Sequence, residues 1–295
     1  MGFNDELTAH LSETEQIIRK YLPEETGFHK TVLEAMNYSV LAGGKRLRPM
    51  LMLETYRLFG GNGEVIEPFM AAIEMIHSYS LVHDDLPALD NDEYRRGRKS
   101  THAAFGEAMG ILAGDALLNY AYETALKAFD TDTDMKRVAE SLKVLAEKAG
   151  IGGMVGGQVV DVESEGKTID AETLMFIHRN KTGALIEAAM MTGAILAGAD
   201  EGQVAAVERA AGDIGLAFQI RDDILDVTGT EAELGKPIGS DEKNGKVTYV
   251  TFYGFDQAEA KVRSLSENAI GILHSLPVQN PFLEQLLLSL VERTK

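Results

Sequence analysis

The sequence contains no cysteine, and this absence removes several kinds of chemistry at once. A chain without cysteine forms no disulfide, no cysteine-ligated zinc site and no iron–sulfur cluster, and it has no thiol nucleophile. Proline is also scarce, with 7 residues, most of them between stretches of helical periodicity or at their ends. Alternating polar and apolar runs, which would indicate strands, are nearly absent. The sequence therefore predicts helices rather than a sheet or a disulfide scaffold.

Basic residues are few relative to acidic ones. Lys and Arg number 28 and Asp and Glu number 46, which gives a net charge of −18. Such a chain repels nucleic acid and anionic membranes, so an anionic substrate would need local basic clusters or metal ions. No apolar run reaches membrane-spanning length, and the nearest, residues 184–199, is interrupted by Glu187. Residues 1–16 are polar and acidic, unlike a signal or transit peptide, so we expect a cytoplasmic protein without stable membrane association.

Apolar residues recur at spacings of three and four along most of the chain, which predicts helices. The predicted helical ranges are 3–21, 31–41, 50–58, 70–83, 103–129, 134–149, 173–196, 203–227, 256–276 and 281–292. No Ser/Gly-rich or Pro-rich linker divides them, so we predict an all-α fold, a single large helical bundle in one domain spanning 1–295. Residues 109–118 and 184–199 are apolar on most faces and are expected at its centre.

Two clusters of aspartates each end an apolar helix. They comprise Asp84, Asp85 and Asp90 in the first cluster and Asp222, Asp223 and Asp226 in the second. Pro87 interrupts the first helix, which allows the carboxylates on either side of it to turn the same way. Carboxylates at a helix C-terminus oppose the helix dipole and repel one another, so two such clusters disfavour a purely solvated role. Their oxygens suit Mg²⁺, which commonly joins one or two carboxylates to substrate phosphates.

Two compact basic clusters accompany the aspartates, at residues 43–49 and 94–99. The guanidinium fork of Arg and the point charge of Lys are both suited to phosphate oxygens. The first cluster is not a Walker A loop, because Arg46 occupies the place of the Ser or Thr that would bind Mg²⁺. Acidic and basic clusters together predict a diphosphate head group, and the apolar helices between them predict a hydrophobic tail. A prenyl diphosphate combines both.

These motifs, in this order, resemble the short-chain trans-isoprenyl diphosphate synthases, and most of all the bacterial farnesyl diphosphate synthases (geranyltranstransferases). The resemblance covers nearly the whole chain. The matching segments are residues 43–49, 84–90, 95–97, 157–161, 181–183, 218–226 and 235–237. Each motif alone is weak, but the ordered set is specific, although Glu93-Tyr94 departs from the usual acidic and aliphatic pair. The resemblance implies helices around a central cavity and a homodimer.

The resemblance also implies a role for each motif residue. Asp84 and Asp90, with Asp85 less directly, would bind metal on one wall, and Asp222, supported by Asp223 and Asp226, on the opposite wall. The residues that bind isopentenyl diphosphate would be Lys45, Arg48, His77 and Arg96. Those that bind the allylic diphosphate or line its reacting end would be Arg95, Lys181, Thr182, Gln219 and Lys236. The cofactor would be Mg²⁺, about three ions per active site, with Mn²⁺ as the alternative ion.

Product length is assigned to one aromatic residue. Tyr79 lies about 7.5 Å before Asp84 along a helix, deeper than the metal site, and the resemblance implies that its ring closes the tail cavity. The predicted reaction condenses isopentenyl diphosphate with dimethylallyl or geranyl diphosphate to give farnesyl diphosphate and diphosphate. The alternative is a geranylgeranyl diphosphate synthase, which performs one more condensation at the same site.

Two further classes fit less well. A terpene cyclase would lack the basic isopentenyl-diphosphate residues, so Lys45, Arg48 and Arg96 argue against it. A catalytically silent subunit of a heteromeric synthase would have lost an aspartate motif, and both are intact. Asp115 and Asp161 are expected to support the site rather than to bind substrate.

Overall fold

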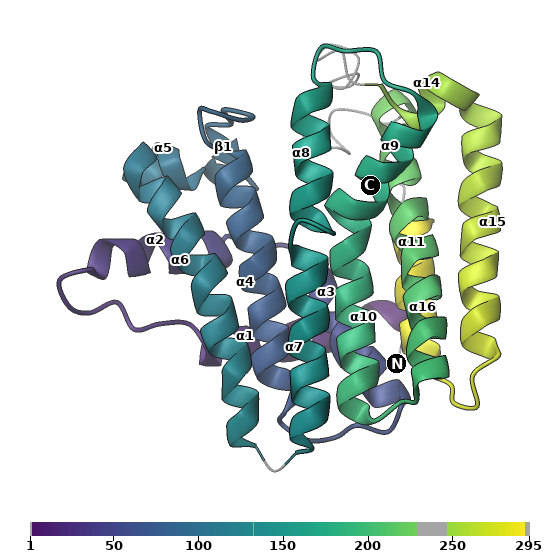
Figure 1. The fold of residues 1–295 in the computed structure, drawn as a ribbon, viewed down its shortest axis with the longest axis horizontal. Coiled ribbons are helices and arrows are strands. Elements are labelled where there is room, and N and C mark those ends of the chain that lie inside the picture. Colours follow the sequence, from purple (N-terminus) through teal and green to yellow (C-terminus); the bar gives the residue numbers. More distant parts are fainter. Residues whose placement is uncertain (1, 132, 229–246, 293–295) are drawn as a thin grey trace. The chain divides into compact units, whose positions relative to one another are not determined.

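The computed structural model describes residues 2–131, 133–228 and 247–292, and the predicted all-α fold is confirmed (Figure 1). Contacts within the chain define two compact units, and each unit combines segments that are distant in sequence. Unit 1 comprises Met1–Leu53 and Asn62–Leu142, and unit 2 comprises Glu54–Gly61 and Lys143–Lys295. The single domain expected from the sequence stays a prediction.

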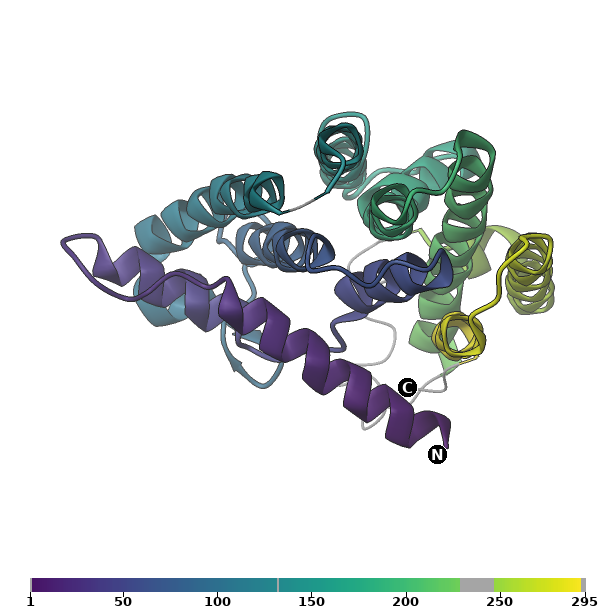
Figure 2. The same cartoon turned by 90° about the horizontal axis from the view of Figure 1, so that it is seen from below.

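Unit 1 is built around α4, most of whose residues are buried. Its helices are α1 (Phe3–Lys20), α2 (Lys30–Val40), the start of α3 (Leu47–Leu58), α4 (Ile66–Asp84), α5 (Thr101–Phe105), α6 (Glu107–Leu126), the 3₁₀ turn η1 (Lys127–Asp130) and the start of α7 (Met135–Ala149). In Figure 2, α4 lies between α6 and α1. Gly114 on α6 faces the His83 ring, where a Cβ would overlap it, so this glycine allows α4 and α6 to approach closely.

A two-stranded antiparallel hairpin follows α4, with β1 (Tyr94–Arg95) paired to β2 (Arg98–Lys99). It presents the second basic cluster. Arg96 at its turn has φ +52°, a left-handed conformation uncommon for a residue with a Cβ.

Unit 2 is centred on α10 and α11, with α11 lying between α10 and α15 (Figure 1). Its helices are α8 (Met154–Ser164), α9 (Ala171–Ile177), the π turn η2 (His178–Gly183), α10 (Ala184–Ala197), α11 (Glu201–Thr228), α14 (Tyr249–Tyr253), α15 (Phe255–His274) and α16 (Pro281–Val291). As expected for residues 184–199, α10 is buried on nearly every side. The N-terminal cap of α16, Asn280, donates from Nδ2 to the Glu54 carbonyl at 3.1 Å and thereby ties the end of α3 to unit 2.

The structure differs from the sequence prediction at several helices. Predicted helix 103–129 is broken at Gly106, whose φ of +89° ends α5 and begins α6. Residues 109–118, expected at the centre of the bundle because they are apolar on most faces, are not buried on every face, since Ile111 and Leu112 are 43% and 50% exposed. One side of α6 packs on α4, and Ile111 and Leu112 lie on an exposed side of the helix. Helix α8, which begins among glycines, was not predicted.

Within the described ranges, no helix combines the length and the apolar character that crossing a bilayer requires.

Candidate active site

The first aspartate motif begins where α4 ends. The N–H of Asp90 donates to the carbonyl of Asp84 at 2.9 Å, so the chain returns to the helix end after Pro87. Asn91 closes this loop with φ +54°, and its N–H donates to the carbonyl of Leu86 at 3.1 Å. The backbones of the two predicted metal ligands are therefore adjacent, as the interruption at Pro87 indicated, with Asp84 half-buried and Asp90 exposed.

Asp85 faces a different partner. Its side chain is 3% exposed and pairs with Arg95 through both carboxylate oxygens, with Nε 2.7 Å from Oδ1 and 2.9 Å from Oδ2, and Nη2 2.6 Å from Oδ1. Burial raises the pKa of Asp85, and the guanidinium opposes that rise. Burial lowers the pKa of Arg95, but the pair with Asp85 outweighs it and the pKa lies above its usual value. Asp85 thus orients a residue predicted to bind the allylic diphosphate, which fits its less direct predicted role.

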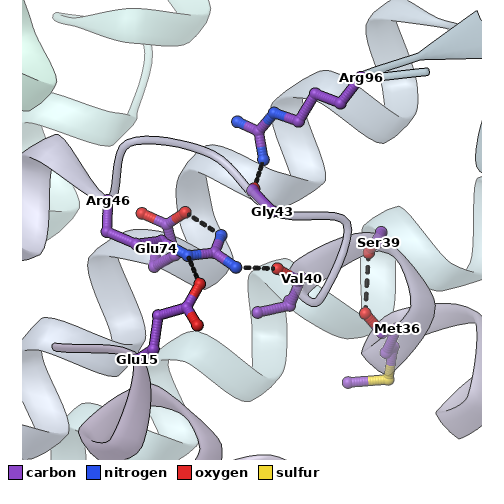
Figure 3. A network of polar contacts seen from close by, with 8 residues as sticks. All are labelled: Glu15, Met36, Ser39, Val40, Gly43, Arg46, Glu74 and Arg96. Carbon is purple, nitrogen blue, oxygen red and sulfur yellow. Dashed lines mark hydrogen bonds and ion pairs between the residues drawn. The ribbon is translucent and has the colours of Figure 1, made fainter. Parts of the chain in front are cut away.

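The isopentenyl-diphosphate residues predicted in unit 1 lie near one another. Burial, followed by the charges of Arg48 and Arg96, holds the pKa of His77 well below its usual value, so the imidazole is neutral. Burial also lowers the pKa of Arg48 to about 10, and Arg96 adds to this effect. The side chain of Arg96 donates from Nη1 to the carbonyl of Gly43 (Figure 3). Lys45, on the same loop, is exposed.

In unit 2, a cavity of about 350 Å³ gathers most of the residues predicted for the second wall. Its polar lining consists of Asp161, Ser164, Glu165, Lys167, His178, Lys181, Gln219, Asp222, Asp223 and Thr248. Asp226 and Thr182 are not part of this lining, and Asp226 is buried at 2% exposure. The structure thus brings Lys181, Gln219 and Asp222 to one cavity. Lys236 lies outside the described residues.

Lys181 is held by a contact that the sequence indicated only in part. Its Nζ lies 2.6 Å from Oδ2 of Asp161 on α8, which gives this aspartate the supporting role expected for it. Lys181 and Thr182 belong to the π turn η2, and such wide turns within helices are frequent at functional sites. Gly157 on α8 lets the two backbones meet, since a Cβ there would lie 2.8 Å from Cα of Lys181.

His178 is a cavity residue that sequence reasoning missed. It begins η2 and is buried, and burial lowers its pKa to about 4 despite the opposing charge of Asp161. Its Nε2 lies 3.8 Å from Oδ2 of Asp223. That same carboxylate oxygen accepts the N–H of Tyr249 at 2.6 Å and so fixes the first turn of α14. In the sequence, His178 follows an apolar stretch without any distinguishing signal.

Tyr79 is buried on α4 at 6% exposure. Burial raises its pKa to about 12, with Tyr122 and Asp84 contributing, so the hydroxyl stays protonated. Its ring meets His83 edge-to-face at a centroid distance of 5.8 Å. A large rigid ring therefore occupies α4 just before the first aspartate motif.

The carboxylates fit a metal ion that is shared with a substrate. Among the described residues, no three Asp, Glu or His side chains form a ready-made metal cage. Asp84, Asp90 and Asp222 nevertheless offer the hard oxygen donors that Mg²⁺ prefers, and this ion commonly takes its remaining ligands from water and phosphate oxygens.

Comparison with known proteins identifies relatives along most of the chain. The polyprenyl synthetase family model matches residues 29–275. A farnesyl diphosphate synthase of Geobacillus stearothermophilus is 46% identical, over 84% of this chain and 83% of the relative. A geranylgeranyl diphosphate synthase of Cyanophora paradoxa is also 46% identical, over 90% and 89%. The solved geranyltransferase of Helicobacter pylori, complexed with magnesium and isoprenyl diphosphate, superposes with a TM-score of 0.84 at 30% identity, covering 99% of this chain and 97% of that one.

The chain therefore belongs to the polyprenyl synthetase family. Its place among these relatives makes it a trans-prenyltransferase, an enzyme that elongates prenyl chains.

Proposed function

We propose that the enzyme condenses isopentenyl diphosphate with dimethylallyl or geranyl diphosphate and releases farnesyl diphosphate and diphosphate. The observation that carries this proposal is the cavity of unit 2, where Lys181 lies beside Gln219 and Asp222. The basic cluster of unit 1 supplies the second diphosphate site that chain elongation needs. Because condensation joins two substrates, we propose that both units act together as one catalytic domain.

The chemistry follows from the charges of these residues. The C1–O bond of the allylic substrate breaks, which leaves an allylic cation and diphosphate. The double bond of isopentenyl diphosphate attacks C1, and the proton lost from its C2 passes to the departed diphosphate. Lys181 and Arg95 would stabilise that diphosphate by charge, while Thr182 and Gln219 would line the region where the positive charge develops. Lys45, Arg48, His77 and Arg96 hold the second diphosphate.

We propose Mg²⁺ as the cofactor, about three ions per site, with Mn²⁺ as a substitute. Bound Mg²⁺ supplies Lewis-acid stabilisation of the diphosphate. Asp84, Asp90 and Asp222 would hold it. The relative from Helicobacter pylori, described as a complex with magnesium and isoprenyl diphosphate, supports this assignment. Activity should vanish in EDTA and return with added Mg²⁺, and full turnover in chelator would contradict it.

The product assignment has one competitor, because a geranylgeranyl diphosphate synthase is as similar as a farnesyl one. We propose farnesyl diphosphate because the buried ring of Tyr79 closes the tail path. The decisive experiment supplies radiolabelled isopentenyl diphosphate with each allylic starter and Mg²⁺. Reverse-phase analysis of the dephosphorylated products then gives the chain length. A main product with one further isoprene unit would show that the enzyme is a geranylgeranyl diphosphate synthase instead.

We also propose a homodimer. The exposed Ile111 and Leu112 on α6 support it, because an apolar helix face of this kind commonly marks a protein interface. Sedimentation of the wild type and of Leu112→Glu tests this, since the charge should shift the enzyme toward monomer. Prenyl diphosphates are its only proposed substrates, and neither nucleic acid nor a stable membrane contact is proposed. A cytoplasmic location, proposed from the sequence, is tested by fractionation.

A further inference from the structure

Arg46 lies within the basic loop, but its side chain points into unit 1 and is 3% exposed. Its Nη1 lies 2.8 Å from Oε1 of Glu74 on α4, and its Nη2 donates to the carbonyl of Val40 at 2.8 Å. Its Nε lies 3.4 Å from Oε1 of Glu15 on α1 (Figure 3). All three nitrogens therefore face the protein, so Arg46 does not contact a diphosphate, unlike the roles proposed for its neighbours.

Glu74 is the counter-charge of this region. It is 2% exposed, and a buried carboxylate is costly unless it is paired. Burial lowers the pKa of both Arg48 and Arg96, and in each case the charge of Glu74 opposes that change. Glu74 thus lies close enough to attract either arginine. While Arg46 is paired with Glu74, the guanidinium groups of Arg48 and Arg96 remain available to a diphosphate.

The backbone of the loop at residues 43–49 depends on the same contact between Arg46 and Glu74. Arg46 has φ +46°, an unfavourable conformation that persists only where the surroundings impose it. Three residues earlier, the carbonyl of Gly43 accepts a hydrogen bond from Arg96. A Cβ at Gly44 would lie 2.7 Å from Cζ of Arg96, so the guanidinium rests directly on the loop. Any shift of the loop backbone would therefore move Arg96 as well.

We propose that Arg46 is a positioning residue for the isopentenyl-diphosphate site. Its pairing with Glu74 and Glu15 fixes the loop that carries Lys45, and it keeps Arg48 and Arg96 from turning toward Glu74. This inference rests on the function proposed above. Its effect falls on one substrate, because the loop belongs to the isopentenyl-diphosphate site and not to the cavity of Lys181.

The test compares Arg46→Met and Arg46→Lys with the wild-type enzyme. Arg46→Met should raise KM for isopentenyl diphosphate at least about tenfold, which corresponds to about 1.4 kcal/mol of binding free energy. KM for geranyl diphosphate should stay within roughly twofold of wild type. Arg46→Lys keeps the charge but lacks the guanidinium fork that reaches three partners. Its KM for isopentenyl diphosphate should therefore lie between those of the wild type and Arg46→Met. If Arg46→Met does not fold, Arg46→Lys and Glu74→Gln decide the question by the same comparison.

Two further variants separate positioning from stability. In the double variant Arg46→Met/Glu74→Met, an apolar pair replaces the buried ions, which often restores stability. Tm should recover, while KM for isopentenyl diphosphate should stay above the wild-type value, because the loop still lacks the contact of Arg46, but below that of Arg46→Met, because no Glu74 carboxylate attracts Arg48 or Arg96. The matched control is Lys148→Met in unit 2, where Lys148 pairs with Glu208 at 2.7 Å and also with Glu187. Tm should fall while that KM is unchanged.

The proposal is overturned if KM for isopentenyl diphosphate follows Tm through the whole set, or if Arg46→Met leaves it unchanged. A wild-type enzyme that forms no elongated product would instead refute the proposed function. Binding of isopentenyl diphosphate alone, measured by calorimetry with and without Mg²⁺, would then still report on Arg46.

Discussion

Replacing Gly157 by Ala should damage catalysis through the backbone that carries Lys181. The added Cβ would lie 2.2 Å from the backbone nitrogen of Lys181, and 2.8 Å from both its Cα and the carbonyl carbon of Asn180. Ordinary carbon–carbon contacts are about 3.5–4.0 Å, so η2 must move by roughly 1 Å. A misplacement of about 1 Å costs on the order of 100-fold in rate. Because Lys181 is proposed to bind the allylic diphosphate, kcat/KM for geranyl diphosphate should fall by about that factor.

Stability should fall less than activity. Overpacking typically costs about 1–3 kcal/mol, while Ala gains about 0.5–1 kcal/mol over Gly within a helix. The net loss of at most about 2.5 kcal/mol corresponds to a Tm lower by no more than about 10 °C, at about 2–4 °C per kcal/mol. Gly152→Ala is the matched control, since a Cβ there meets nothing within 4 Å. Equal steady-state constants for the two variants would refute the reasoning.

The remaining predictions concern the proposed ligands and the tail cavity. Asp84→Asn and Asp222→Asn should each lower kcat by about 10²–10³-fold, the usual effect of losing one such transition-state contact, with an unchanged circular dichroism spectrum. Near-normal activity would mean that the aspartate is not a ligand. Arg96→Ala should chiefly raise KM for isopentenyl diphosphate, whereas Lys181→Ala should chiefly impair the allylic substrate; the opposite pattern would show that the two sites are exchanged. Tyr79→Ala should lengthen the products in reverse-phase analysis and reduce stability through the lost packing, and products of unchanged length would place the end of the cavity elsewhere.

Periodicity and local composition predicted most of the helices. An apolar stripe such as that of α11 is a local property of the sequence, so it can be recognised before the fold is known. The return of Asp90 to the end of α4 was also foreseeable, because a proline cannot continue a regular helix.

Contacts between distant positions left no comparable signal. The motifs single out Lys181 and Asp161 separately, but nothing in the sequence near either residue indicates that η2 and α8 bring them together. The same holds for Arg46 and Glu74, whose burial depends on packing within unit 1. The π turn η2 was predicted as ordinary helix because it lies between two apolar stretches of helical spacing, and α8 was overlooked because its glycines weaken the pattern. Each of these features depends on tertiary packing.

The tie between Asn280 and Glu54 bears on how the chain folds during its synthesis. The hydrogen-bonded residues are 226 positions apart, so the end of α3 emerges long before its partner is made. Most of unit 1 can collapse once residue 142 is available, whereas residues 54–61 pack with unit 2, whose remaining residues begin at 143. Contacts of such separation form slowly, and the waiting segment exposes apolar side chains meanwhile. Premature termination before Asn280 should therefore leave a partly folded chain that is prone to aggregation.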